Sequence, residues 1–323
     1  MTAGFVDPVR IGILGAAKIA PRVVVEPAAT RGDVIVQAVA ARDRSRAERF
    51  ASMHNIGCVA EDYEALVSRD DIDLVYIALP IGAHAEWTER ALSHGKAVLC
   101  EKSLALDAQQ ARTMVDAAKS AGLPLIEAFH YRFHAIIARA LFIIESGELG
   151  TVESAEASFH YPIPKSRDEI RWRPDQGGGV LGDLGCYPVH ALRTLLGTEP
   201  DLEAAQVHIE DGVDAACSAK LRFGSVPATI STSMIDETPA ASLAIRGSEG
   251  TLRIDNYIAP QAGFHFEVQR GDMVRDELLE APPTYTAQMD HVIDVMRGRA
   301  APLTGGTDAI ANLMVLDAIR AWR

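Results

Sequence analysis

Residues 9–20 read VRIGILGAAKIA, a short apolar run that passes directly into a loop of small residues. The run 9–14 has the composition of a buried strand, and residues 15–20 form a G-x-A-x-x-A variant of the dinucleotide-binding fingerprint. A second apolar run, 34–40, is typical of the next strand of a parallel sheet. This order predicts a unit that holds a pyrophosphate at a helix N-terminus. The predicted contacts are Gly15, Ala16, Ala17, Lys18 and Ile19.

The end of the second strand indicates which dinucleotide is bound. Proteins that bind NAD place an acid on the ribose hydroxyls, whereas NADP-binding proteins often place an arginine on the 2′-phosphate. Here Ala41 stands where the acid would be, and Arg42 follows it, with Arg44 or Arg46 behind. We therefore predict NADP. NAD is the alternative, because Asp43 comes one residue late and can either serve NAD or cap the next helix.

Strands and helices alternate up to about residue 126. The pattern predicts helices at 46–54, 63–68, 84–94 and 107–121, and strands at 74–79, 97–100 and 123–128. That order indicates a doubly wound parallel sheet, whose ligands bind beyond the carboxyl ends of the strands. The residues predicted at those ends are Leu79, Pro80, His84, Glu101 and Lys102. His84 can alternatively anchor a loop, and Glu101 can shape the lysine turn.

The second part of the chain has a different pattern. After a predicted helix at 135–146, the expected strands are 151–159, 206–210, 215–223, 226–234, 242–246, 251–254 and 264–269, and helices at 285–297 and 307–322 end the chain. We predict an α/β protein with two domains. Residues 1–126 form a dinucleotide-binding Rossmann domain, and residues 127–323 form an α+β substrate-binding and oligomerisation domain with an open, mostly antiparallel sheet. The C-terminal helix can pack back on the first domain.

A glycine-rich run, GGGVLGDLGCY at 177–187, carries the strongest candidate for chemistry. If it is helical from about residue 180, Asp183 and Tyr187 share one face. The glycines allow another molecule to approach the backbone closely. An ordinary buried helix with Asp183 as its cap is the alternative. Just upstream, Arg171 and Trp172 are a candidate edge of the substrate loop, or a packed tryptophan flanked by solvated arginines.

Taken together, these motifs and the segment EAFHYRFH at 127–134 resemble the glucose-fructose oxidoreductase, inositol dehydrogenase and rhizopine-catabolism family (Gfo/Idh/MocA). The resemblance implies a Rossmann domain, an open-faced sheet and an active site between them. The family's Glu-Lys-Pro motif corresponds to Glu101-Lys102-Ser103, and because serine replaces proline we do not assume a cis peptide there. Tyr187 stands where many members have histidine, which resembles the dihydrodiol and sugar dehydrogenase branch, whose members more often use NADP.

The resemblance implies hydride transfer between nicotinamide C4 and a secondary alcohol or carbonyl of a sugar, cyclic polyol or dihydrodiol. We expect Tyr187 to exchange the proton, with its pKa lowered by the Lys102 ammonium. Asp183 is expected to orient the substrate hydroxyl and keep Lys102 charged. Arg171 and Trp172 complete the expected substrate site. A regulator that senses NAD(P) or sugar without chemistry is the alternative function.

Composition limits the other partners. A net charge of −13 argues against a nucleic-acid partner. No apolar run approaches the ~18 residues of a membrane span, and the N-terminus lacks the features of a secretion signal, so we expect a cytoplasmic protein. The four cysteines are widely spaced and are expected to be reduced thiols.

His130 and His134 have metal-pair spacing, but the cation Arg132 lies between them, so we predict no metal. We expect a homo-oligomer, a dimer or a tetramer, because an exposed face on the second sheet needs a cover.

Overall fold

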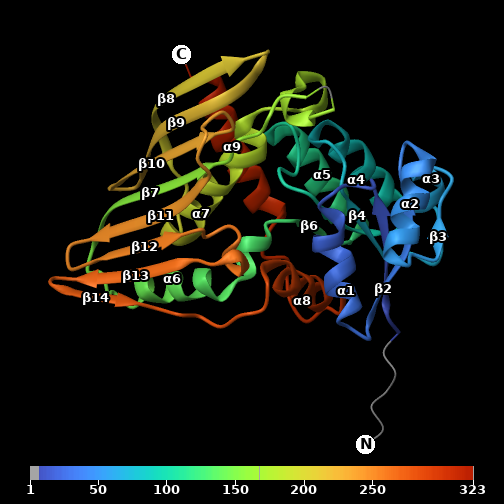
Figure 1. The fold of residues 1–323 in the computed structure, drawn as a ribbon, viewed down its shortest axis with the longest axis horizontal. Helices are drawn as coiled ribbons and strands as arrows, with labels where there is room; N and C mark the ends of the chain where they lie inside the picture. The colour runs from blue at the N-terminus through green and yellow to red at the C-terminus, as the bar shows by residue number, and fades with distance from the viewer. Residues whose placement is uncertain (1–6, 167, 323) are drawn as a thin grey trace, which may run out of the picture.

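The computed structural model describes residues 7–166 and 168–322 and contains two sheets side by side (Figure 1). All strands of the first sheet are parallel, in the order β3-β2-β1-β4-β5-β6. Their bounds are β1 Val9–Leu14, β2 Val34–Ala40, β3 Cys58–Val59, β4 Leu74–Ile77, β5 Ala97–Cys100 and β6 Leu125–Glu127. This is the predicted doubly wound sheet, with the addition of the two-residue edge strand β3, which is too short to show a pattern.

Helices cover both faces of the first sheet, because alternate residues of each strand point to opposite sides. Along β4, Val75 and Ile77 belong to one apolar core and Leu74 and Tyr76 to the other. The helices from this part of the chain are α1 Glu26–Ala29, α2 Arg44–His54, α3 Tyr63–Val67, α4 His84–Ser93 and α5 Ala108–Ala121. Aspartates cap two of these helices: Asp43, for which the sequence left a cap as one possibility, accepts from the Ser45 N–H, and Asp107, at the predicted start of its helix, accepts from the Gln110 N–H.

The second sheet has the order β14-β13-β12-β11-β7-β10-β9-β8, and it is antiparallel except where β7 lies beside β10. Its strands are β7 Val152–His160, β8 Asp201–Glu210, β9 Val213–Phe223, β10 Val226–Ser233, β11 Ala240–Gly247, β12 Thr251–Asp255, β13 His265–Arg270 and β14 Met273–Asp276. Helices α6 Ala135–Glu145 and α7 Cys186–Leu196 cover one face (Figure 1). The pattern missed β14, whose residues are all exposed and therefore do not alternate.

The other face of the second sheet is polar. Glu156 and Ser158 of β7 lie opposite Thr229 and Ser231 of β10, and the neighbouring strand continues the row with Lys220. Glu156, Thr229 and Lys220 are exposed, while the alternate residues of these strands are buried. We expected this face to need a cover because exposing it would be costly. That reason is wrong, because polar side chains keep this face compatible with water.

The last two helices return to the first half of the molecule. Helix α8, Thr284–Met296, contributes Val292 and Ile293 to the core that contains Leu74 and Tyr76. Helix α9, Gly306–Ala321, packs beside α5 (Figure 1), where Asp317 accepts a hydrogen bond of 2.8 Å from the Ala108 N–H. None of the helices in the part of the chain that the structure describes is long and apolar enough to span a bilayer.

Candidate active site

The loop after β1 has the geometry expected of a dinucleotide-binding turn. Gly15 has a φ of +99°, and a Cβ there would lie 2.4 Å from the Ala78 carbonyl oxygen, so only glycine fits. Its N–H donates to the Ala40 carbonyl at 2.8 Å, which joins the loop to the end of β2. The predicted contacts that follow are partly or fully exposed, namely Ala16, Ala17, Lys18 and Ile19. The helical turn beginning at Pro21 comes directly after them.

Three arginines near the end of β2 have different environments. Arg42, next to the partly exposed Ala41, is exposed, and its guanidinium makes no ion pair within residues 7–166 and 168–322. Arg46 reaches the glycine loop, donating to the Ala16 carbonyl at 3.1 Å. Arg44 instead pairs with Glu48 at 2.9 Å. An anion at this loop would therefore meet Arg42 and Arg46, which fits the phosphate of NADP.

Lys102 and Asp183, 81 positions apart in the chain, meet in a partly buried ion pair. The Lys102 Nζ lies 2.6 Å from Asp183 Oδ1 and 2.7 Å from the Asp183 carbonyl oxygen. The exposed fractions of the two side chains are 12% and 15%. Burial lowers the pKa of Lys102, but the Asp183 carboxylate more than offsets this and the pKa is raised. Lys102 is therefore an ammonium at neutral pH.

The peptide bond between Lys102 and Ser103 is cis. We did not assume a cis bond from the sequence, because serine replaces the family's proline there, and the structure shows that the geometry is present without it. The Ser103 hydroxyl donates to the Gly182 carbonyl at 3.0 Å. This bond joins the lysine turn to the glycine-rich run.

Asp183 has a second cationic partner. Arg171 Nε donates to Asp183 Oδ2 at 2.6 Å, and Arg171 also pairs with Glu169 at 3.0 Å. Burial raises the pKa of Asp183, but Lys102 and Arg171 together hold it at about 2. The Arg171 side chain is 40% exposed, so a ligand can reach it.

Trp172, which we expected at the edge of the substrate site, is packed into the protein. Trp172 is only 8% exposed, and its indole N–H donates to the Ile163 carbonyl at 2.9 Å. The Lys165 Nζ lies over its ring, 4.6 Å from the centroid. Trp172 is thus a packing residue, as in the alternative interpretation, whereas Arg171 beside it is not simply solvated.

Tyr187 lies beside Lys102 but is more buried than the sequence suggested. The Lys102 Nζ is 5.4 Å from the centroid of the phenol ring, and Tyr187 is 5% exposed. Phe129 and Phe159 pack against it with their rings nearly perpendicular to the phenol ring. The hydroxyl is within 3.3 Å of His130 Nε2. Burial raises the pKa of Tyr187 well above its usual value, so the expected lowering by Lys102 is wrong.

The backbone between Asp183 and Tyr187 also differs from the expected α-helix. Residues Leu181–Gly185 form a π-helical turn that leads directly into α7. The packing is tight here, since a Cβ at Gly185 would lie 3.2 Å from the Thr232 methyl carbon. The turn still presents both side chains to Lys102, as a π-type insertion often does at a functional site.

The other residues at the strand ends have structural contacts. His84 is fully buried, with Nδ1 2.9 Å from the Ser103 carbonyl and Nε2 2.9 Å from the Leu79 carbonyl. It therefore anchors two loops, as in the alternative interpretation, and has no exposed surface for a cofactor. Leu79 and Pro80 are partly exposed at the end of β4. Glu101 accepts a hydrogen bond of 2.7 Å from Tyr76, and burial raises its pKa.

Two residues of the segment 127–134 belong to the site, although only the family resemblance pointed to this segment. Glu127 is 1% exposed, and its Oε1 accepts from the Leu104 N–H at 2.7 Å, close after Lys102. Burial raises the pKa of Glu127 to about 8. His130 lies against the Tyr187 hydroxyl, and burial lowers its pKa to about 3. Neither contact is visible from spacing along the chain.

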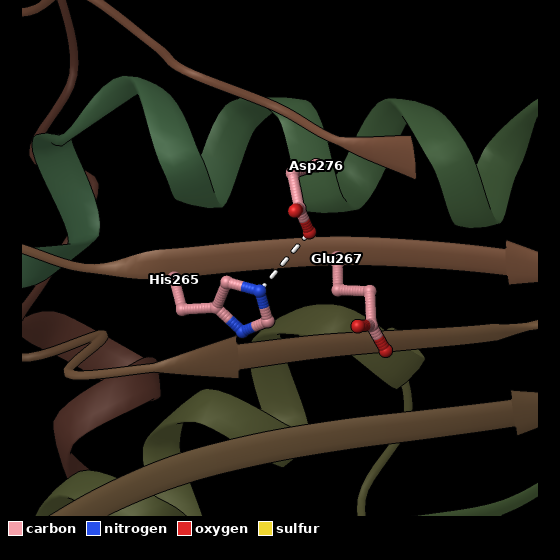
Figure 2. Close-up of side chains that lie close together, drawn as sticks. All are labelled: His265, Glu267 and Asp276. Atoms are coloured by element: carbon pink, nitrogen blue, oxygen red, sulfur yellow. Dashed lines mark hydrogen bonds and ion pairs between the residues drawn. The ribbon is translucent and has the colours of Figure 1, made fainter. Parts of the chain in front are cut away.

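His130 and His134 do not form a metal site with other ligands in the described parts of the chain. The one group of suitable spacing there is His265, Glu267 and Asp276, on the edge strands β13 and β14 (Figure 2). His265 Nε2 is hydrogen-bonded to Asp276 at 3.0 Å, and the group faces solvent. Such surface pairs need no ion, so we assign no metal here.

The chain matches two protein-family models. One, described as an oxidoreductase family with an NAD-binding Rossmann fold, matches residues 9–129, and the other, the GFO/IDH/MocA C-terminal domain, matches residues 137–253. A dTDP-3,4-didehydro-2,6-dideoxy-alpha-D-glucose 3-reductase of Streptomyces violaceoruber is 35% identical over 100% of this chain and 98% of its own. A D-xylose 1-dehydrogenase (NADP(+)) of Haloferax volcanii is 32% identical over 95% of each chain.

A solved structure of a reductase is similar to this chain as well. The 3-ketoreductase KijD10 of Actinomadura kijaniata, in complex with NADP and TDP-benzene, superposes with a TM-score of 0.92. It is 31% identical, and the match covers 98% of both chains. The likeness therefore extends over both sheets and the region where Lys102, Asp183 and Tyr187 meet.

Proposed function

Because the chain belongs to the Gfo/Idh/MocA family of oxidoreductases, we propose that it transfers hydride between nicotinamide C4 of NADP and a ring carbon of a sugar or a related cyclic polyol or diol. The carbon interconverts between a secondary alcohol and a carbonyl. One observation carries this assignment: the Lys102 ammonium lies between the Asp183 carboxylate and the Tyr187 ring. The three groups lie beyond the carboxyl ends of the first sheet's strands, where such folds bind their ligands.

The coenzyme assignment rests on residues of this chain. Gly15 lets the backbone turn tightly at the end of β1, and Arg46 lies against that turn. Arg42 is exposed beside them, where a 2′-phosphate would find two guanidinium groups. When bound, NADP accepts or supplies the hydride. NADP in the relatives' names and complexes supports this coenzyme over NAD.

Each of the three central side chains has a proposed role. Tyr187 is neutral in this structure because burial raises its pKa, so it is ready to donate its proton to a carbonyl oxygen that becomes a hydroxyl. Lys102 faces the phenol ring and stabilises the negative charge that proton donation leaves there. Asp183 keeps Lys102 charged and accepts a hydrogen bond from a substrate hydroxyl.

The substrate would enter beside Arg171, whose guanidinium holds Asp183 from the side opposite Lys102. Arg171 is the most exposed member of this group and offers donors to the oxygens of a sugar or of an attached phosphate. The relatives' names, which include a dTDP-sugar reductase and a xylose dehydrogenase, support a sugar substrate.

Three coarser proposals accompany this function. We place the domain boundary near residue 126, where the first sheet ends with β6. A homo-oligomer, a dimer or tetramer through the polar face of the second sheet, is proposed because that sheet has eight strands and helices α6 and α7 cover only its other face. A cytoplasmic location is proposed because Cys58, Cys100, Cys186 and Cys217 are all unpaired.

The test is turnover with both coenzymes. The purified chain is mixed with NADPH and a panel of keto-sugars, including TDP-linked ones, or with NADP and aldoses, inositols and cyclic diols. The absorbance of the reduced nicotinamide reports hydride transfer. We expect turnover of at least one sugar and its loss in Lys102→Ala. Tight NADP binding without turnover of any panel member, unchanged in Lys102→Ala, would instead identify a sensor.

A further inference from the structure

Tyr63 reaches back from the start of α3 to the end of β2. Its hydroxyl oxygen accepts a hydrogen bond of 3.2 Å from the Arg42 N–H. Its ring is partly buried and packs nearly perpendicular to the Trp87 ring, with the centroids 5.0 Å apart. Asp62, the residue before it, caps α3 by accepting from the Ala65 N–H at 2.7 Å. The fold therefore holds the phenol at the strand end where a Rossmann domain recognises the ribose that carries the 2′-phosphate.

The Tyr63 hydroxyl still has a hydrogen to donate. A phenol can donate one hydrogen bond and can also accept, and the bond from Arg42 uses only its oxygen. Within residues 7–166 and 168–322 this hydroxyl donates to no protein acceptor. Burial raises the pKa of Tyr63, although Arg42 and Arg46 oppose the rise, so the phenol keeps its hydrogen at neutral pH. The hydrogen is available to a ligand.

The charges beside this hydroxyl favour an anion. The guanidinium groups of Arg42 and Arg46 both lie close enough to act on the pKa of the phenol. Arg46 gives one hydrogen bond to the Ala16 carbonyl and keeps its other N–H donors. The carboxylate of Asp43 is turned to the start of α2, where it accepts from the Ser45 N–H at 2.9 Å and from the Ser45 hydroxyl at 2.7 Å. Asp43 therefore does not occupy the two guanidinium groups.

We propose that the Tyr63 hydroxyl donates to the 2′-phosphate of NADP, beside Arg42 and Arg46, and so increases the preference for NADP over NAD. This inference rests on the proposed coenzyme. A phosphate monoester carries close to two negative charges at pH 7. A hydrogen bond to such an ionised oxygen is roughly twice as strong as one between neutral groups. NAD has a neutral hydroxyl at the same position, so it gains less from the phenol.

Tyr63→Phe removes the hydroxyl and keeps the ring that packs on Trp87. The substrate-free protein is titrated by calorimetry with NADP, with NAD and with 2′,5′-ADP, which has the 2′-phosphate but no nicotinamide. We expect the affinity for NADP and for 2′,5′-ADP to fall about 10-fold, and the affinity for NAD to change by less than about 2-fold. Equal changes for all three ligands, or no change for any, would overturn the proposal.

Trp87→Phe is the matched control. It alters the packing beside Tyr63 and leaves the hydroxyl in place, so the ratio of NADP to NAD affinity should stay at the wild-type value. A ratio that falls as far as in Tyr63→Phe would mean that ring packing, and not the hydroxyl, sets the preference. That result would also overturn the proposal.

Tyr63→Phe also removes the acceptor of the Arg42 N–H, so an effect through Arg42 must be separated from a direct contact. The Arg42→Ala background serves this purpose, because it keeps the backbone N–H and lacks the guanidinium group. We expect Tyr63→Phe to lower NADP affinity in this background as well, by at least about 3-fold. If the effect of Tyr63→Phe disappears there, Tyr63 acts only by positioning Arg42, and the direct contact is wrong.

The phosphate itself provides a readout that does not depend on affinity. In ³¹P NMR of bound NADP, the 2′-phosphate is titrated with pH and its pKa is measured. Donors to the dianion lower this pKa, so Tyr63→Phe should raise it relative to the wild type. An unchanged phosphate pKa would contradict the contact. A wild type that binds NAD more tightly than NADP would refute the proposed coenzyme, whereas a wild type that prefers NADP and is unaffected by Tyr63→Phe would refute only the role of Tyr63.

Discussion

The Lys102 ammonium is held by two oxygens of the same residue, the side-chain Oδ1 and the backbone carbonyl of Asp183, at 2.6 and 2.7 Å. The Rossmann domain supplies the lysine and the glycine-rich run supplies the acceptor. Because the carbonyl belongs to the π-helical turn, the position of the ammonium is tied to the backbone as well as to a side chain. The pair therefore fixes where the two parts of the site meet.

Replacing Lys102 with alanine should lower kcat by about 10²–10⁴-fold, because Tyr187 loses the positive charge beside its ring. Asp183 keeps its bond to Arg171, so the chain should still fold. Steady-state kinetics and circular dichroism check both points. Lys119→Ala, at an exposed position of α5, is the control and should behave as wild type. An active Lys102→Ala enzyme would contradict the mechanism.

Tyr187→Phe should keep the fold and lose turnover. The ring contacts with Phe129 and Phe159 remain, and the lost hydrogen bond to His130 costs only about 1 kcal/mol in the free energy of unfolding. The kcat should fall by about 10²–10⁴-fold because the proton donor is gone. Thermal melting and initial rates are the measurements. Tyr161→Phe, at a 53% exposed tyrosine, serves as the control. Undiminished rates would rule out the phenol as the acid.

Arg171→Gln should raise the pKa of Asp183 from about 2 towards its ordinary value, since one of its two cationic partners is removed. A carboxylate whose pKa is lowered in the folded state stabilises the fold above its unfolded pKa, and that contribution is lost as pH falls through the folded pKa. The variant should therefore be less stable than wild type at neutral pH, with the difference shrinking towards pH 2. Denaturant titration across this range is the test, with Arg173→Gln as the exposed control. A pH-independent difference would contradict this origin.

Glu127→Gln should change how stability depends on pH. Burial raises the pKa of Glu127 to about 8, so the folded state binds this proton more tightly than the unfolded state. Its stabilising contribution is complete below the unfolded pKa and is lost as pH rises through about 8. Relative to wild type, the glutamine variant should therefore be more stable at pH 8 than at pH 5. Each pKa unit corresponds to about 1.4 kcal/mol, so unfolding by urea resolves the effect. Parallel stability curves would refute a buried neutral acid.

Arg42→Ala should weaken the binding of NADP by about 1–3 kcal/mol and leave the binding of NAD nearly unchanged, because only NADP has the 2′-phosphate. Calorimetric titration with both coenzymes gives the two differences. Arg44→Ala is the matched control, since Arg44 pairs with Glu48 one turn further along the same helix, α2. Arg46→Ala should resemble Arg42→Ala, because Arg46 contacts the glycine loop. Equal losses of affinity for NAD and NADP would show that Arg42 does not bind the 2′-phosphate.

Much of the fold follows from local pattern in the sequence. The first sheet, the helix caps at Asp43 and Asp107, and the central strands of the second sheet each show a period or a capping residue that can be read along the chain. The pattern does not predict two of the strands: β3, which has only two residues, and β14, in which every residue is exposed. Neither can carry a hydrophobic period, because a period needs both length and one buried face.

Some features of the candidate site can likewise be predicted from the sequence, and others cannot. Motifs with fixed spacing and the family resemblance were enough to predict the glycine turn at Gly15, the arginine at the end of β2, and Lys102, Asp183 and Tyr187 as candidate site residues. The packing of Trp172, the burial and raised pKa of Tyr187, and the contact of its hydroxyl with His130 appear only in the folded structure. The physical reason is that burial and hydrogen-bond partners depend on residues far apart in the chain, which no local spacing encodes.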